Sequence, residues 1–130
     1  MSASIWDASA LLLLLQQEPG WQELGPRLPG STMSSVNLSE VATKLLTSGG
    51  ALGTTREVLA GLPIEIHDFT ADLAYLAAEL RGPTKHLGLS LGDRACLALG
   101  LSMGGPILTA DRAWLGVDLG VEIELVRPAG

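Results

Sequence analysis

Aromatic residues are scarce in this chain, at 4% of 130 residues. Its core must therefore be filled by aliphatic side chains, chiefly leucine, alanine and valine. Hydrophobic residues make up 47% of the chain, which is enough for one continuous core in a chain of single-domain length. Charged residues reach only 17% and form no block of like sign, which excludes a charged disordered tail. We expect one domain over residues 1–130.

Cysteine is nearly absent as well. The single Cys96 excludes an internal disulfide and is typical of a reducing compartment, and its apolar neighbours predict that it is buried. The leucine run Leu11–Leu15 is too short to cross a bilayer, and the acidic Asp7 stands where a signal peptide carries positive charge. We therefore expect a cytoplasmic protein with no membrane association.

Positive charge is also in short supply, since 8 Lys and Arg oppose 14 Asp and Glu for a net charge of −6. Phosphate binding normally requires a basic surface, so this balance is unusual for a protein that binds nucleic acid. Divalent cations held by convergent acids reverse the local field. A basic partner, or acidic surface far from any site, accounts equally well for the rest, so composition leaves the source of the negative charge open.

Strand-like and helix-like segments alternate along the chain. Short apolar or alternating segments predict strands at 4–6, 32–35, 64–67, 106–109 and 121–126. Helical spacing and helix-stop residues predict helices at 8–17, 19–28, 38–47, 54–62, 70–80 and 91–102, with a helical turn at 112–115. This order predicts an α/β fold with a mainly parallel sheet of four to five strands, covered by helices on both faces. The last strand is expected to lie at an edge or to have one face exposed to water.

Four acidic residues occupy equivalent places in this pattern. Asp7 directly follows the first strand, and Asp111 follows the fourth. Glu40 and Asp93 are each expected in the first turn of a helix. In an open α/β sheet the carboxyl ends of strands and the N-termini of helices gather along one edge, where ligands bind. The topology therefore allows the four carboxylates to meet in one pocket.

Helix capping explains each of these acids, taken singly, at least as well. Asp7 and Asp111 are suitable N-caps. Glu40 and Asp93 each stand three residues after a potential N-cap, as in a capping box, and Glu40 also precedes Lys44 by one turn. Position in the chain does not decide between capping and a shared site.

Local sequence distinguishes the two interpretations. Four segments occur in a fixed order: IWDASAL at 5–11, SVNLSEV at 35–41, LSLGDRACLA at 89–98 and ILTADRAW at 107–114. Each alone is common, but the ordered set closely resembles the PIN-domain family, and in particular the VapC-type toxins of type II toxin–antitoxin pairs. The resemblance covers nearly the whole chain. It implies a PIN-like three-layer α/β/α fold, an endoribonuclease, a cognate antitoxin that lies over the site, and a homodimer.

The resemblance also assigns roles to individual residues. Four residues match the acids that hold Mg²⁺ or Mn²⁺ for phosphodiester cleavage, the first and third most directly: Asp7, Glu40, Asp93 and Asp111. Three more match small polar residues that support such a site by hydrogen bonding: Ser9, Asn37 and Thr109. Oxygen ligands suit Mg²⁺ or Mn²⁺, and the chain has no cysteine and histidine set for zinc. The expected reaction is in-line attack of metal-activated water on RNA, with one ion or two.

Contacts to RNA are less clearly marked. Five cations are candidates for phosphate contacts, although solvated surface charge explains each as well: Lys44, Arg81, Lys85, Arg94 and Arg112. Trp6 and Trp114 flank the acids in sequence, and core packing is favoured over base stacking for both. The sequence does not specify the RNA target.

Other α/β classes fit this sequence less well. A receiver domain needs a pair of acids after the first strand, and a phosphatase of the haloacid dehalogenase type needs D-x-D, but Asp7 has no such acidic neighbour. The segment Gly49–Gly53 does not follow a strand and is a poor phosphate-loop signal. The remaining alternative is a PIN-like fold that binds RNA or protein with weak or no cleavage.

Overall fold

The computed structural model describes residues 4–126, and they fold around one parallel sheet. Its five strands follow the order β3-β2-β1-β4-β5, and all four pairings are parallel. The strands are β1 (Ile5–Trp6), β2 (Ser31–Ser34), β3 (Ile64–His67), β4 (Ile107–Thr109) and β5 (Ile123–Leu125). The predicted α/β class is confirmed, and β5 lies at the sheet edge as expected.

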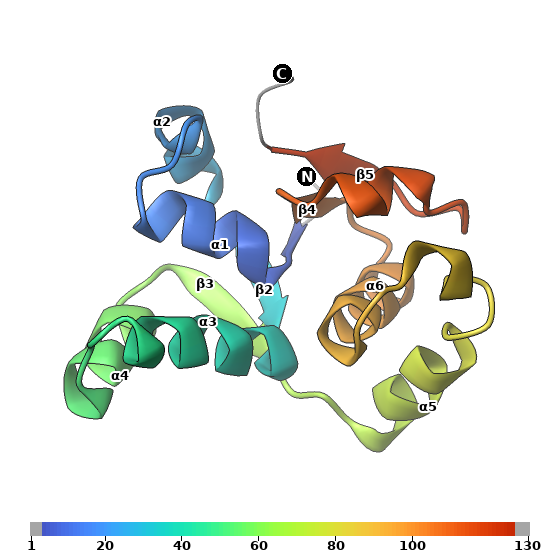
Figure 1. The fold of residues 1–130 in the computed structure, drawn as a ribbon, viewed down its shortest axis with the longest axis horizontal. Helices are drawn as coiled ribbons and strands as arrows, with labels where there is room; N and C mark the ends of the chain where they lie inside the picture. Colours follow the sequence, from blue (N-terminus) through green and yellow to red (C-terminus); the bar gives the residue numbers. More distant parts are fainter. Residues whose placement is uncertain (1–3, 127–130) are drawn as a thin grey trace.

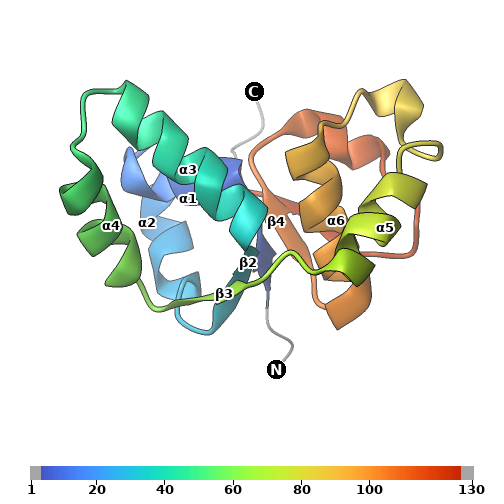
Figure 2. The same ribbon diagram turned by 90° about the horizontal axis from the view of Figure 1, so that it is seen from below.

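Helices cover both faces of the sheet and complete the three layers. The α-helices are α1 (Ala8–Leu15), α2 (Trp21–Leu24), α3 (Ser35–Thr47), α4 (Leu52–Ala60), α5 (Ala71–Glu79) and α6 (Leu91–Met103). Short 3₁₀ helices are η1 (Gly25–Arg27), η2 (Lys85–Leu87) and η3 (Arg112–Gly116). Helices α1 to α4 lie on one side of the sheet and α5 and α6 on the other (Figures 1 and 2).

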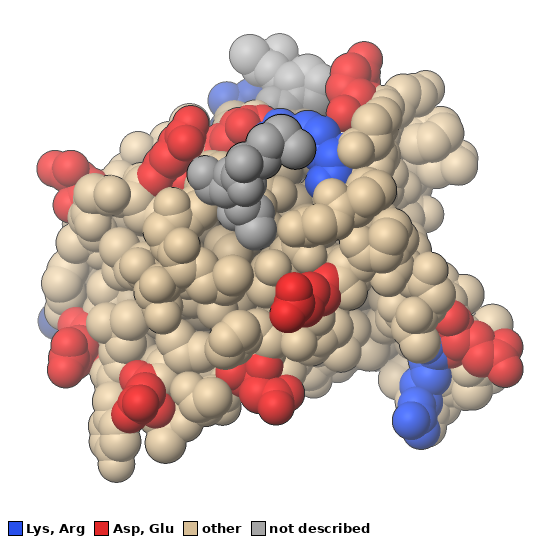
Figure 3. All heavy atoms as spheres, turned by 180° about the vertical axis from the view of Figure 1, so that it is seen from behind, with Lys and Arg blue, Asp and Glu red and all other residues tan. Residues whose placement is uncertain are grey.

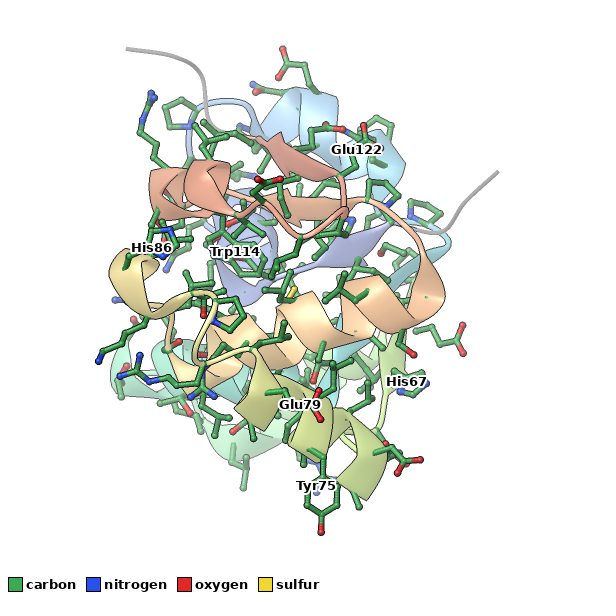
Figure 4. The ribbon with its side chains drawn as sticks, turned by 90° about the vertical axis from the view of Figure 1, so that its right-hand side faces the viewer. His67, Tyr75, Glu79, His86, Trp114 and Glu122 are labelled. Atoms are coloured by element: carbon green, nitrogen blue, oxygen red, sulfur yellow. The ribbon has the colours of Figure 1, made fainter. Side chains whose placement is uncertain are left out.

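Alternation along the two central strands builds two cores. Ile5 and Ile107 belong to the cluster that packs against α5 and α6, whereas Trp6 and Leu108 belong to the cluster on the opposite face. Successive side chains of a strand point to opposite faces, so short strands buried on both faces need apolar residues throughout. Trp114 is also fully buried and is directed into the interior between η3 and α6 (Figure 4). Both tryptophans therefore serve the core, as predicted.

The start of α3 differs from the prediction. Residues 32–35 were expected to be extended and the helix to begin at 38, but β2 ends at Ser34. The Ser34 hydroxyl accepts a 3.2 Å hydrogen bond from the Val36 N–H and caps a helix that begins at Ser35. Asn37 consequently lies inside the first turn, and Glu40 lies in the second. The predictions that Glu40 belongs to the first turn and forms a capping box with Asn37 are wrong, because a serine caps the helix three residues earlier.

The longest helices of the described residues are α3 and α6, with 13 residues each. None of the helices in residues 4–126 is both long enough and apolar enough to span a bilayer. The leucine run instead forms α1, in which Ala10, Leu11 and Leu13 are buried.

Candidate active site

The N-terminal ends of α1, α3 and α6 converge near the centre of the view in Figure 1, at the edge where the parallel strands end. Asp7 lies at this edge, between β1 and α1, and is only 4% exposed. Its Oδ1 accepts hydrogen bonds from the Ser9 hydroxyl (2.7 Å) and the Ala10 N–H (3.0 Å), and its Oδ2 accepts one from the Thr109 hydroxyl (2.6 Å). Asp7 is thus the N-cap of α1, as one of the two interpretations expected, and it is also a buried carboxylate.

Burial makes the charged form of Asp7 unfavourable. It raises the pKa of the carboxyl from 3.8 to about 6, although the three hydrogen bonds from Thr109, Ser9 and Ala10 act in the opposite direction. The negative charge of Asp93 raises the pKa further. A cation beside Asp7 would reverse this effect by favouring the carboxylate.

Two hydroxyl groups connect Asp7 to the end of β4. The Ser9 Oγ, besides donating to Asp7, accepts a 2.9 Å hydrogen bond from the Ala110 N–H. The Thr109 Oγ1 likewise accepts a 3.1 Å hydrogen bond from the Asp111 N–H. Ser9 and Thr109 therefore lie against the carboxylate that they were expected to support, and they fix β1 and β4 relative to each other.

Asp93 lies in the first turn of α6 and forms the predicted capping box with Ser90. The Ser90 hydroxyl accepts a 3.2 Å hydrogen bond from the Asp93 N–H, and Asp93 Oδ2 accepts a 3.0 Å hydrogen bond from the Ser90 N–H. The charge of Asp93 nevertheless acts on Asp7. The two acids therefore lie at the same edge of the sheet, although they are far apart in sequence.

Glu40 reaches the same edge from α3. The Asn37 amide, which is 1% exposed, donates to Glu40 Oε1 (2.8 Å) and to the Gly92 carbonyl oxygen (3.1 Å). The Glu40 carboxylate thus lies beside the residue that precedes Asp93. No ion pair with Lys44 forms within the described part of the chain, so Asn37 takes the place of the expected partner. The oxygen of the same side-chain amide, Asn37 Oδ1, is buried without a hydrogen-bond partner.

The same acids act on the buried thiol of Cys96. Burial raises its pKa, and the negative charges of Asp7, Asp93 and Glu40 raise it further. Three of the four predicted acids therefore lie near one turn of α6. Asp111 is different: its side chain is exposed and accepts a 2.9 Å hydrogen bond from the Ala113 N–H, which caps η3.

The five candidate phosphate-binding cations lie on different elements. Arg94 is held by the fold, because its Nη1 donates a 2.9 Å hydrogen bond to the Ala77 carbonyl of α5. The other four are exposed: Lys44 on α3, Arg81 and Lys85 between α5 and α6, and Arg112 on η3. On the face seen in Figure 3, acidic side chains are scattered over a largely uncharged surface with few basic ones. Part of the negative charge is therefore dispersed surface charge.

A divalent ion needs several ligands that converge on one point. As they lie, no three Asp, Glu, His or Cys side chains of residues 4–126 are arranged to hold one. Each acid instead accepts hydrogen bonds from nearby groups. The available donors are carboxylates and the unpartnered amide oxygen of Asn37, which are the hard ligands that Mg²⁺ and Mn²⁺ prefer. The residues fit such an ion by their chemistry, since a carboxylate that accepts hydrogen bonds keeps further lone pairs that can bind a cation.

The class of this protein follows from the fold and the acids together: an α/β domain with carboxylates at the carboxyl edge of a parallel sheet. The model of the PIN domain matches residues 5–118, and the chain belongs to the PIN domain family. The family resemblance recognised in the sequence is thereby confirmed. A comparison with curated proteins gives no significant match.

Several solved structures share this fold over nearly their whole length. One chain of a toxin-antitoxin complex from Klebsiella pneumoniae is 19% identical to this chain, with a TM-score of 0.76. The match covers 98% of this chain and 100% of that chain. DNA-bound VapBC from Salmonella typhimurium is 17% identical, with a TM-score of 0.74 and coverage of 97% and 99%. Mycobacterium tuberculosis VapC20, a toxin that cleaves the sarcin-ricin loop, is 18% identical, with a TM-score of 0.73 and coverage of 92% and 99%. At these identities the likeness is one of fold.

Proposed function

We propose that this protein is a Mg²⁺- or Mn²⁺-dependent endoribonuclease that acts as the toxin of a toxin–antitoxin pair. The observation that carries the proposal is the buried Asp7 carboxylate, on which the charge of Asp93 acts, with the charge of Glu40 near the same turn of α6. Burial and the like charge of Asp93 disfavour the charged form of Asp7, and a bound cation would favour it. Membership of the PIN family and the fold shared with an RNA-cleaving toxin support RNA as the substrate.

The proposed ligands of the ion are the carboxylates of Asp7, Asp93 and Glu40, with Asp111 as a fourth acid at the margin. A bound divalent ion supplies an activated water and neutralises charge that develops on the phosphate. Ser9 and Thr109 orient Asp7 through their hydroxyl groups, and Asn37 orients Glu40. These hydrogen bonds restrict the side chains of Asp7 and Glu40.

Four exposed cations are the proposed phosphate contacts. Arg112 directly follows Asp111 on η3, and Arg81 and Lys85 lie on the connection that leads to α6. Lys44 lies one turn beyond Glu40. Arg94 has a second role in packing α6 against α5, so we expect its substitution to reduce stability as well as RNA binding.

The antitoxin, the homodimer and the cytoplasmic location belong to the same proposal. The solved Klebsiella and Salmonella structures are of a toxin-antitoxin complex and of VapBC bound to DNA, which supports a cognate antitoxin for this chain. An antitoxin that lies over the acids would need positive charge there, which agrees with the net charge of −6.

The second candidate is a PIN domain that binds RNA or protein with weak or no cleavage. It is favoured by one observation: the described acids, as they lie, are not arranged to hold an ion. It predicts RNA binding that does not depend on Mg²⁺ and no cleavage products.

A cleavage assay with metal-site and control variants separates the two candidates. Purified protein is incubated with total RNA in Mg²⁺, Mn²⁺ or EDTA, as wild type, as Asp93→Asn and as Asp118→Asn. Asp118 is an exposed acid after η3 and provides a matched Asp→Asn control. We expect cleavage only with metal, lost in Asp93→Asn and kept in Asp118→Asn. Cleavage in EDTA, or by Asp93→Asn, contradicts the proposal. Sequencing of RNA ends from cells that express the chain alone then identifies the target.

A further inference from the structure

Gly92 is the second residue of α6 and immediately precedes Asp93. Its backbone is helical and its φ is not positive, so its conformation does not require glycine. Glycine is also less favourable than alanine in a helix. Another reason must therefore account for a glycine at this buried position.

The space beside Gly92 is occupied by the Glu40 carboxylate. A Cβ atom added to Gly92 would lie within 3.0 Å of Oε1, Oε2 and Cδ of Glu40, closer than real Cβ contacts. The carboxylate rests against the Cα of Gly92 because no side chain is present there. Any larger residue would force the end of the Glu40 side chain to move.

Asn37 holds the same carboxylate from α3. One Asn37 amide donates both to Glu40 Oε1 and to the carbonyl oxygen of Gly92. It therefore fixes the carboxylate and the residue on which the carboxylate rests, and it connects the adjacent N-terminal ends of α3 and α6 (Figures 1 and 2). Because this amide is almost fully buried, water does not compete for these bonds.

We propose that Gly92 and Asn37 form a carboxylate seat that positions Glu40 beside Asp93. Both are positioning residues: the first supplies space and the second supplies hydrogen bonds. Glu40 is an exposed residue of α3, and without the seat its side chain would extend into solvent. In the seat, the carboxylate lies at the N-terminus of α6, where the helix dipole favours negative charge and offsets repulsion from Asp93. The effect on metal binding rests on the proposed function, whereas the geometry does not.

The chain offers a matched control for Gly92. Gly53 is also the second residue of a helix, α4, and a Cβ atom there would meet nothing within 4 Å. Gly53→Ala therefore makes the same chemical change at the same helical position in open space.

The first readout is structural and needs no metal. The side-chain amide resonances of Asn37 are recorded by NMR in EDTA for wild type, Gly92→Ala, Glu40→Ala, the double variant and Gly53→Ala. We expect Gly92→Ala and Glu40→Ala to shift them alike, because each removes the carboxylate from Asn37. The double variant should equal Glu40→Ala, and Gly53→Ala should equal wild type. If the Asn37 resonances are the same in Gly92→Ala as in wild type, the proposed seat is overturned.

The second readout is the affinity for Mn²⁺ measured by calorimetry on the same proteins. Loss of a group that orients a ligand typically weakens metal binding 10- to 100-fold, so we expect at least about a tenfold loss in Gly92→Ala. No further loss should appear when Gly92→Ala is added to Glu40→Ala. If the wild type binds Mn²⁺ and Gly92→Ala binds it with equal affinity, the seat is overturned and the proposed function is left intact. A wild type that binds no Mn²⁺, with the expected amide shifts, supports the seat and contradicts the proposed function.

Discussion

The Thr109 hydroxyl donates a 2.6 Å hydrogen bond to Oδ2 of Asp7, and so joins the carboxyl ends of β4 and β1. The two strands are neighbours in the centre of the sheet, with Ile5 paired to Ile107 and Trp6 to Leu108. The next positions in this register are Asp7, which follows β1, and Thr109, which ends β4, so the two residues lie side by side. The same hydroxyl also accepts a hydrogen bond from the Asp111 N–H.

Thr109→Val removes this hydroxyl while keeping the shape of the side chain. The buried Asp7 oxygen then has no donor, so we expect a loss of about 1–3 kcal/mol in the free energy of unfolding. Cleavage should fall at least about tenfold, because the carboxylate is no longer oriented. Urea denaturation and the RNA cleavage rate measure the two effects.

Thr84→Val is the control for that substitution. Thr84 is equally buried, but its hydroxyl donates to the Leu80 carbonyl at the end of α5, away from the acids. It should lose stability and keep cleavage per folded molecule. An equal loss of cleavage in both variants would mean that Thr109 acts on the fold in general.

Asp7→Asn should stabilise the metal-free protein at neutral pH. The pKa of Asp7 is raised from 3.8 to about 6, so the protonated carboxyl favours the folded state below about pH 4, and this contribution is lost as the pH rises through about 6. A rise of about two pH units corresponds to roughly 3 kcal/mol. In EDTA the variant should therefore be more stable than wild type at pH 7 and lose this advantage near pH 4. Parallel pH–stability curves for the two proteins would contradict the assignment of the penalty to Asp7.

Glu124→Gln should show the opposite pH dependence. Arg27 forms a two-point ion pair with Glu124, which connects η1 to β5, and the Arg27 hydrogen bond and charge lower the pKa of Glu124. The pair stabilises the fold above the ordinary pKa of glutamate, and the effect disappears as the pH falls through the lowered value. Because both side chains are about 40% exposed (41% and 38%), we expect less than about 1 kcal/mol at pH 7. Urea denaturation at pH 7 and pH 3 checks this, with the exposed Glu65→Gln on β3 as control.

Mg²⁺ or Mn²⁺ should raise the melting temperature of the wild type, since a ligand that binds only the folded state stabilises it by about 2.7 kcal/mol at 100 times its Kd. Asp7→Asn and Asp93→Asn should abolish this rise, and Asp118→Asn should keep it. Differential scanning fluorimetry measures the response. A wild-type melting temperature that changes with neither ion would contradict the proposed metal binding.

Local signals predicted the parts of the fold that local chemistry determines. The alternation at 64–67 gave β3 with its observed bounds, and the Ser90–Asp93 capping box marked the start of α6. The apolar context of Trp6 correctly favoured the core. These features depend on residues close together in sequence.

Features that depend on contacts between distant elements were missed. Several polar residues around position 35 were able to cap α3, and the choice depends on where β2 ends in the sheet. Gly92 gave one weak signal, a glycine where a helix favours alanine, but its contact partner Glu40 lies on another helix. The family resemblance matched the four acids, whereas the structure groups Asp7, Glu40 and Asp93 and leaves Asp111 at η3.

Anomalous diffraction from crystals soaked in Mn²⁺ tests the central claim most directly, because it locates the ion without reference to activity. The account predicts a peak bound by the carboxylates of Asp7 and Asp93, with Glu40 beside it, and no such peak in Asp7→Asn crystals. Mn²⁺ found only at other acids, with the Asp7 carboxylate still bonded to Ser9, Ala10 and Thr109 and to no ion, would contradict it.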